Sequence, residues 1–430
     1  MALPPALALA IALAMTAACV GSAPLPPPDP AGIDLARADV ARATGTSAEA
    51  ATAAGAMNAF GLDLYRAISG TDGNVVFSPS SIALAVAMAR AGARGETAAE
   101  MDRVLHDLAA EGRENGINAL DLALSERSGS FIDQGGEELD VTLRIANAPF
   151  AQRGMPLEQA YLEALATGFG AGLRLVDYIG ATEDSRRLIN EWVAGQTEDR
   201  IPELIGPGTL TPMTRLTLVN AIYLKAPWQT RFEPEATTDD AFTRLDGTTV
   251  QVPFMRTASS FRYAAGDGWR AVELPYVGGS LAMTIVVPED LVAFEAALDV
   301  AALDALVTAL EDRQVDLSFP KFGIETRAEL ARVLGLLGMP TAFDEVNADF
   351  SGITTAEQLF ISDVIHQANI DVDEAGTEAA AATAVVMRAT SIPVDEVELS
   401  VDRPFLFLLR DLPTGAVVFM GRVADPSVER

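Results

Sequence analysis

Residues 374–393 read EAGTEAAAATAVVMRATSIP. Four consecutive alanines, Ala379–Ala382, favour a helix by intrinsic propensity. Threonine and valine follow at once and Gly376 stands just before, and these residue types suit strands and hinges. The composition therefore leaves two interpretations open, a long helix or a segment that can become a strand.

As a strand, this segment would place its side chains alternately on two faces. The first face carries Thr377, Ala379, Ala381, Thr383, Val385 and Met387. The second face carries Glu378, Ala380, Ala382, Ala384, Val386 and Arg388. Both charges lie on the second face, so the first is small or apolar throughout and could slide over a packed core. A chain that moves from an exposed loop into the middle of a sheet needs such a face.

The rest of the chain predicts helices mixed with large sheets. Ser78-Pro79 is a typical helix start, because serine caps the first turn and proline needs no amide hydrogen there. The apolar run Leu216–Leu224 predicts a central strand, and Asp246-Gly247 predicts the turn of a hairpin. Arg327–Leu337 is expected to be an amphipathic helix closed by Gly338. Helices and strands do not alternate regularly, which indicates an α+β fold.

The N-terminal region predicts export. Ala6–Ala18 is an apolar run too short to span a bilayer comfortably and is typical of a signal peptide, expected over residues 1–19. Small residues before Cys19 resemble a bacterial lipoprotein cleavage site, where the cysteine receives a lipid; plain signal-peptidase cleavage is the alternative. Residues 20–56, rich in Pro, Ala and Asp, are expected to form a tether before a domain over 57–430. We expect an extracellular or periplasmic protein, touching a membrane only through a lipid on the cysteine.

Composition excludes several classes of partner. The formal net charge is −30, from 60 acidic and 30 basic residues. A field of that sign repels nucleic-acid phosphates and anionic lipid. Sulfated polysaccharides are not expected either, because they need clustered Lys and Arg. A single cysteine also excludes an intrachain disulfide.

Signatures of catalysis and of metal binding are missing from the sequence. The two histidines are His106 and His366, and neither Gly-x-Ser-x-Gly nor His-Glu-x-x-His occurs. Gly168–Gly172 is rich in glycine but departs from the dinucleotide-binding pattern at Leu173. We therefore expect no enzyme activity, no metal and no cofactor.

Several motifs in chain order resemble the serpin family of serine protease inhibitors. Glu374–Thr383 resembles the hinge of the reactive loop in inhibitory serpins. Further matches are Asn74–Ile82, Gly92–Thr97, Ile189–Val193, Val219–Lys225 with Trp228, Phe319–Phe322, Leu336 with Gly338 and Met339, Asp402–Phe407 and Phe419–Val423. The matches run from about residue 58 to 426, so the chain is identified as a member of this family.

The resemblance implies a single α+β domain with three sheets and eight or nine helices. It implies a monomer whose reactive loop, about residues 374–395, is cleaved by a serine protease, which is trapped as an acyl-enzyme when the loop enters the main sheet. The alternative is a non-inhibitory serpin with a carrier, chaperone or structural role. Such members usually have charged, bulky or proline residues in the hinge, whereas this chain has Thr377, Ala379 and Ala381.

The resemblance also implies where the loop is cut. The seventeenth residue from Glu374 is Thr390, which gives Thr390-Ser391 as the reactive bond. A small β-branched residue there suits elastase-like or subtilisin-like proteases. The alternative is Arg388, which would attract trypsin-like proteases.

Other site residues come from the same resemblance. The implied hinge comprises Glu374, Gly376, Thr377, Glu378, Ala379, Ala380, Ala381, Ala382 and Thr383. Ser78, Ser81, Asn220 and His366 match positions that form a structural polar cluster where the sheet opens. Trp228 matches a residue near the start of insertion, and ordinary core packing would explain it equally well.

Overall fold

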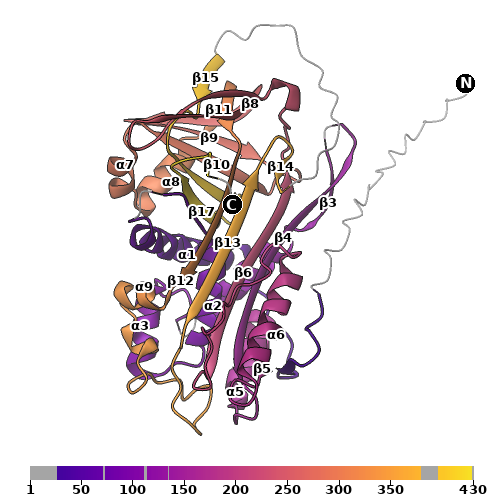
Figure 1. The fold of residues 1–430 in the computed structure, drawn as a ribbon, viewed down its shortest axis with the longest axis vertical. Helices are drawn as coiled ribbons and strands as arrows, with labels where there is room; N and C mark the ends of the chain where they lie inside the picture. The colour runs from indigo at the N-terminus through magenta and orange to yellow at the C-terminus, as the bar shows by residue number, and fades with distance from the viewer. Residues whose placement is uncertain (1–26, 71–72, 111–113, 134, 379–395, 429–430) are drawn as a thin grey trace, which may run out of the picture.

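The computed structural model describes residues 27–70, 73–110, 114–133, 135–378 and 396–428. One tall sheet runs along the molecule and a second lies across its upper end (Figure 1). The main sheet has eight strands. In order across the sheet these are β1 (Asp34–Ala36), β5 (Leu173–Val176), β4 (Glu138–Gln152), β6 (Leu216–Pro227), β14 (Gly376–Thr377), β13 (Val364–Val372) and β12 (Phe322–Glu329), and β3 (Gly129–Ile132) pairs with β4.

The second sheet has nine strands. Its order is β15 (Glu396–Ser400), β11 (Glu311–Pro320), β8 (Thr249–Gly266), β9 (Trp269–Pro275), β10 (Leu281–Pro288), β16 (Phe405–Asp411), β17 (Val417–Val423) and β2 (Val75–Phe77), and β7 (Thr238–Thr243) pairs with β8. The long strand β8 pairs with β7 and β11 along its length and with β9 at its end. The two sheets expected beside the main sheet are therefore continuous through β8.

The described part of the chain contains nine α-helices. They are α1 (Ser47–Ile68), α2 (Pro79–Arg90), α3 (Gly95–Val104), α4 (Glu114–Ser125), α5 (Gln159–Phe169), α6 (Thr182–Gln196), α7 (Leu291–Ala297), α8 (Val300–Thr308) and α9 (Ala331–Leu337), with 3-10 helices at Pro234–Ala236 and Pro340–Phe343. The α+β prediction is confirmed. The cap at Ser78, the strand over Leu216–Leu224 and the hairpin at Asp246-Gly247 are also found.

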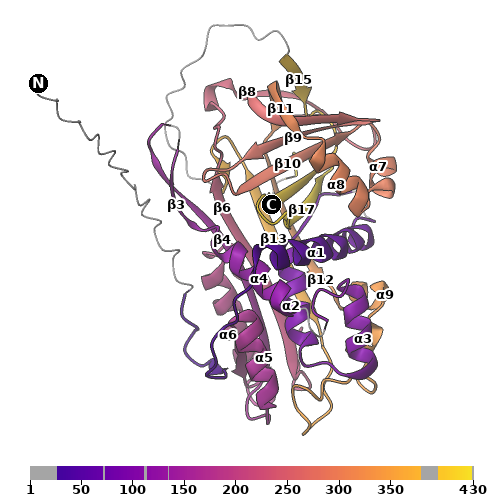
Figure 2. The same cartoon turned by 180° about the vertical axis from the view of Figure 1, so that it is seen from behind.

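The two faces of the main sheet have different covers. Helix α2 packs against β4, β6 and β17 behind the sheet (Figure 2), and its residues from Pro79 to Ala89 are all buried. Helix α6 covers the opposite face, where Ile189 and Trp192 pack with Val219 of β6 and Ile365 of β13. We call the α2 side the inner face and the α6 side the outer face.

The expected tether is wrong from residue 27 onward. Strand β1 pairs antiparallel with β5 at the edge of the main sheet, and helix α1 begins at Ser47, capped by Thr46. The small residues that suggested a linker instead allow α1 to pack closely against α4. A Cβ placed on Gly116 of α4 would lie 3.4 Å from Ala53 Cβ, so these two helices approach closely.

The helix expected over Arg327–Leu337 is also wrong at its start. Arg327, Ala328 and Glu329 end strand β12, which pairs with β13 as far as Ile365. The helix begins only at Ala331, because pairing across the sheet overrides the local pattern. Among the described residues, no helix has the length and apolar character needed to cross a membrane.

Candidate functional site

The hinge segment that begins at Glu374 enters the main sheet between β6 and β13. Strand β14 pairs with Val372 of β13 on one side and with Ala226 and Pro227 of β6 on the other (Figure 1). Lower down, β6 and β13 pair directly with each other over Leu218–Ala221 and Val364–Gln367. We call this line between β6 and β13 the seam; it is open at the top and closed below.

The two residues of β14 fit the seam for different reasons. A Cβ on Gly376 would lie 2.2 Å from Ala226 O, so the position has no room for a side chain. Thr377 is 1% exposed, and its Oγ1 is 2.7 Å from the Tyr276 hydroxyl. The threonine side chain therefore points inward and is hydrogen-bonded.

Trp228 anchors the chain that leads into β14. Its Nε1 donates to Asp373 O at 2.9 Å, and its amide donates to Ala375 O at 2.9 Å. Its indole stacks on Tyr276 with ring centroids 4.5 Å apart and planes 10° apart. The structure thus places Trp228 at the upper end of the seam, beside the hinge.

Glu374 is held by two side chains from other strands. Lys321 Nζ and Thr237 Oγ1 each lie 2.8 Å from a carboxylate oxygen of Glu374. Burial alone raises the pKa of Glu374, but its hydrogen bonds, first of all that from Lys321, lower the pKa by more. The pKa of Glu374 therefore lies below its usual value. The carboxylate therefore stays charged and ties the hinge to the body.

Glu378 is the last described hinge residue. Its amide donates to Asp371 O at 3.0 Å, which continues the ladder with β13, while its φ of 51° turns the chain left-handed. Its side chain is 3% exposed and pairs with Arg200, Nε to Oε2, at 3.3 Å. Several of the predicted site residues lie outside the described part of the chain. They are Ala379, Ala380, Ala381, Ala382, Thr383, Arg388, Thr390, Ser391 and Cys19.

Below the hinge, the structure brings Ser78, Ser81, Asn220 and His366 together on the inner face, all fully buried. His366 and Asn220 are direct partners across the closed seam, and their side chains are hydrogen-bonded through His366 Nδ1. The Ser78 amide donates to His366 Nε2 at 3.1 Å, and Asn220 Nδ2 donates to Ser81 Oγ at 2.6 Å. The cluster therefore links both strands of the seam to helix α2.

His366 must be neutral for this network to exist. Its Nε2 accepts from a backbone amide, so the ring proton lies on Nδ1 and is donated to Asn220 Oδ1. Burial lowers the pKa of His366 from 6.5 to about 3. The ring therefore stays unprotonated at neutral pH and serves as a fixed hydrogen-bonding group.

Sequence reasoning missed Asn147. This β4 residue pairs with Asn220 in the β4–β6 register and accepts hydrogen bonds from Asn220 Nδ2 and, at 3.1 Å, from Ser81 Oγ. The available signal was a lone amide between two alanines in a strand. With it, the inner cluster is Ser78, Ser81, Asn147, Asn220 and His366.

Comparison with known proteins identifies the family. A family model described as Serpin (serine protease inhibitor) matches residues 55–426.

This chain belongs to the serpin family.

Two relatives and one solved structure give the extent of the likeness. An uncharacterized serpin-like protein of Thermococcus kodakarensis is 39% identical over 378 residues, covering 86% of this chain and 85% of the relative. Leukocyte elastase inhibitor A of Mus musculus is 35% identical over 382 residues, covering 85% and 97%. The native thermophilic serpin tengpin superimposes with a TM-score of 0.78 at 25% identity, covering 91% of this chain and all of tengpin.

The serpin family is described as one of serine protease inhibitors and not as one of enzymes. His366 contacts the backbone amide of Ser78 and not its hydroxyl, so it activates no nucleophile there. Within the described ranges, no group of three or more His, Cys, Asp or Glu side chains could hold a metal ion.

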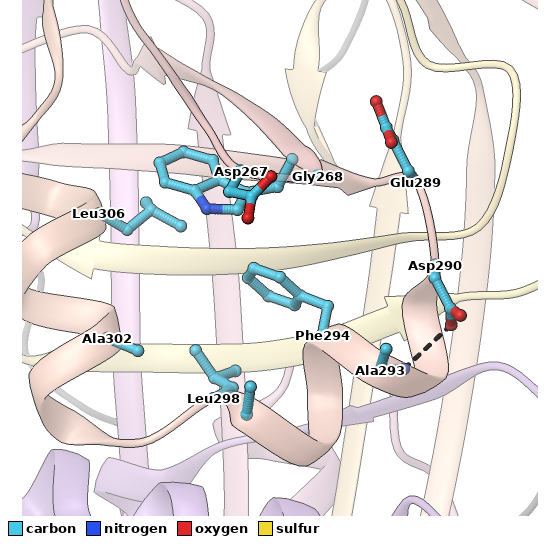
Figure 3. A pocket seen from close by; sticks show the side chains of 11 residues that line it. Asp267, Gly268, Glu289, Asp290, Ala293, Phe294, Leu298, Ala302 and Leu306 are labelled. Carbon is cyan, nitrogen blue, oxygen red and sulfur yellow. Dashed lines mark hydrogen bonds between the residues drawn. The ribbon is translucent and has the colours of Figure 1, made fainter.

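A surface pocket of about 370 Å³ lies away from the seam, between α7, α8 and the β9 end of the second sheet (Figure 3). Its lining includes the apolar side chains of Trp269, Phe294 and Leu306. Glu289 and Asp290 lie to one side of Phe294 (Figure 3). Asp290 accepts a hydrogen bond from the Ala293 amide at 3.0 Å and so caps α7. The residues that line this pocket include no His, Ser, Cys or Lys, and their titratable groups are the carboxylates of Asp267, Glu289 and Asp290.

Proposed function

We propose that this serpin inhibits serine proteases as a suicide substrate whose reactive bond is Thr390-Ser391. The observation that carries the proposal is β14, since Gly376 and Thr377 already pair with both strands of the seam. The hinge has therefore taken the first step of insertion before any cleavage. The further steps need the same seam to open downward.

The register of β14 predicts which residues of β6 and β13 would lie beside each later residue of the loop. Thr377 faces Val372 and Ala226, so each step along the loop moves one residue down both strands. Six steps on, Thr383 would come between His366 and Asn220. The hydroxyl of a threonine can donate and accept a hydrogen bond, so it suits a place where two buried polar side chains lose each other.

The same register predicts which face of the main sheet each loop residue would occupy. Thr377 points to the inner face, and in this register Ala379, Ala381 and Thr383 would follow it on that face. Glu378 shares the outer face with Asp371, where a charge reaches solvent or Arg200. Small side chains would therefore slide over the core, and charged ones would stay outside.

The chemical step uses the catalytic groups of the target protease. Its serine Oγ attacks the carbonyl carbon of Thr390, the bond to Ser391 N breaks, and Ser391 N takes a proton from the protease histidine. Thr390 remains joined to the protease as an ester. Insertion of the freed loop must then move the protease before water hydrolyses that ester.

Hydrogen bonds alone would not drive this insertion. Each contributes about 0.5–1.5 kcal/mol net, whereas ordering the backbone costs about 1–2 kcal/mol per residue. Burial of the charge-free face and relief of a sheet that is only partly filled supply the difference. The native form is therefore metastable in this proposal.

We propose elastase-like or subtilisin-like proteases as targets, because a small residue at 390 fits a small or shallow specificity pocket. The name of the mouse relative, leukocyte elastase inhibitor A, supports this choice. Trypsin-like proteases are the targets if the chain is cut after Arg388. The expected signal over residues 1–19 places the encounter outside the cytoplasm, and fractionation of the producing cells tests this.

The first test mixes the protein with an elastase, a subtilisin and trypsin, and separates each mixture on a denaturing gel. We expect a band at the summed mass, with a released C-terminal peptide that begins at Ser391. A peptide beginning at Ala389 would replace the elastase-like assignment with a trypsin-like one. If every protease cuts the loop and leaves fully active, the protein is a non-inhibitory serpin.

The mechanism is tested by the double substitution Thr377→Arg with Ala379→Glu. A buried arginine and glutamate on the inner face should block insertion and turn the inhibitor into a substrate that is cleaved without a covalent complex. Glu396→Arg, at an exposed position just beyond the loop, is the matched control and should inhibit like wild type. Undiminished inhibition by the double variant would refute insertion.

A further inference from the structure

A short loop after α6 crosses the outer face of the seam. On the β6 side, Arg144 NH1 of β4 donates to Gln196 O at 2.9 Å, and the Tyr223 hydroxyl of β6 donates to Glu198 Oε2 at 3.2 Å. Burial and the charges of Glu198 and Glu378 raise the pKa of Tyr223, so it remains a donor. We call residues 196–200 the outer clasp.

The outer clasp is also tied to the other side of the seam. Asn369 Nδ2 of β13 donates to Arg200 O at 3.0 Å. Arg200 NH1 lies 3.4 Å from Asp371 Oδ2, and its Nε lies 3.3 Å from Glu378 Oε2. One loop therefore holds β4 and β6, β13 and the end of the inserted hinge.

The outer clasp lies at the level where insertion would continue. In the register of β14, residue 380 would come between Asn369 and Tyr223, three steps below Thr377. Admitting a strand there moves β6 and β13 apart by about 4.8 Å. A hydrogen bond does not stretch that far, so the clasp must release one side of the seam.

The backbone of this region is held in sparsely populated conformations. Glu198, Asp199 and Glu378 have φ of 50°, 61° and 51°, all left-handed and none at a glycine. Asn369 Oδ1 is buried and has no hydrogen-bond partner among the described residues. Opening the seam would break the contacts of the outer clasp on one side, so these contacts oppose it.

We propose that Arg200 is a positioning residue that holds the seam closed below Glu378 and so sets how fast the rest of the loop inserts. The inference rests on the proposed function, because only an inserting loop needs such control. The outer clasp is a charged restraint on the surface, whereas the inner cluster is a neutral one in the core.

The test follows uptake of a synthetic peptide with the sequence of residues 379–390, AAAATAVVMRAT, by the intact protein on native gels. Arg200→Gln should take up the peptide at least about three-fold faster than wild type, as expected for loss of an ion pair with one buried partner. Arg200→Lys keeps the charge and should restore most of the slow rate. Arg187→Gln is the matched control, since Arg187 pairs with Asp184 on the exposed surface of α6.

The salt dependence of peptide uptake distinguishes an ion-pair role of Arg200 from a purely structural role. Raising sodium chloride to about 1 M screens the ion pairs and should speed wild-type uptake without changing that of Arg200→Gln. Uptake by Arg200→Gln at the wild-type rate or slower would overturn the proposal. If wild type takes up peptide but traps no protease, only the proposed function fails; if it takes up none, the seam does not open and both fail.

Discussion

The two ends of the seam are built from different chemistry. At the upper end, Glu374 is joined to Lys321 by an ion pair at 2.8 Å in which the lysine side chain is 36% exposed. At the lower end, His366 and Asn220 are neutral, hydrogen-bonded and fully buried. Water can replace a partner at the upper end but not at the lower one, so the lower contacts cost more to break. We therefore expect the seam to open first at its upper end and last at the inner cluster.

The largest effect is expected from removing the amide at the centre of the lower end. Asn220→Ala leaves Ser81, Asn147 and His366 without their shared partner. We expect the free energy of the first unfolding transition in denaturant to fall by about 3 kcal/mol. The buried ring proton of His366 loses its partner, which costs about 1–3 kcal/mol, and Ser81 and Asn147, which keep their bond to each other, lose one hydrogen bond each. Asn347→Ala, at an exposed asparagine, is the control. Equal losses in the two variants would mean that the inner cluster does not secure the seam.

Acid should weaken the lower end next. The folded pKa of His366 is about 3 and its ordinary value is 6.5, so between these pH values the unfolded chain binds a proton that the folded protein does not. The free energy of unfolding should therefore fall as pH is lowered through that window, by about 1.4 kcal/mol per pH unit for this one group.

Two histidine variants isolate this contribution. In His366→Gln, the free energy of unfolding should depend less steeply on pH between pH 6.5 and 3, by the contribution of one proton. In His106→Gln, at an exposed histidine, the wild-type slope should remain. Nuclear magnetic resonance of the His366 ring gives the same answer without a variant. Titration of that ring near pH 6.5 would contradict the buried neutral histidine.

The smallest effect is expected at the upper end. Tyr276→Phe removes the hydrogen bond to Thr377 but keeps the ring stacked on Trp228. We expect the amides of Trp228 and Glu378, which hold the hinge, to exchange with deuterium about five-fold faster, as for a loss of about 1 kcal/mol. Tyr161→Phe removes a comparable bond, to Met88 O, elsewhere in the core and should leave these amides unchanged. A larger loss of stability from Tyr276→Phe than from Asn220→Ala would mean that the upper end of the seam costs more to open than the lower end.

The sequence allowed the seam to be predicted where local chemistry was unusual. The alternating charge-free face of residues 377–387 predicted a strand able to insert, and Gly376 and Thr377 are found paired in the sheet. Ser78 was recognised as a helix cap from Pro79, and it caps α2 while its own amide contacts His366. These features are readable because they depend on neighbours in the chain.

The remaining contacts depend on residues far apart in the chain. Asn147 meets Asn220 through strand register, and Arg200 meets Glu378 through the pairing of β14 with β13. The alanines before Met57 suggested a tether because small residues also suit a chain that packs nothing. Their packing against α4 becomes visible only when the two helices are placed together.

The early start of the folded body has a consequence for distance. Residues 20–26 alone separate Cys19 from Pro27, the first described residue. At about 3.5 Å per residue, that stretch reaches at most about 28 Å. A lipid on Cys19 would therefore keep the β1–β5 edge near the bilayer, with β14 and β15, the strands on either side of the reactive loop, at the other end of the molecule (Figure 1). A protein anchored in this way could inhibit proteases only close to the surface of its own cell. Cleavage by signal peptidase near Cys19 would instead release it to act at any distance.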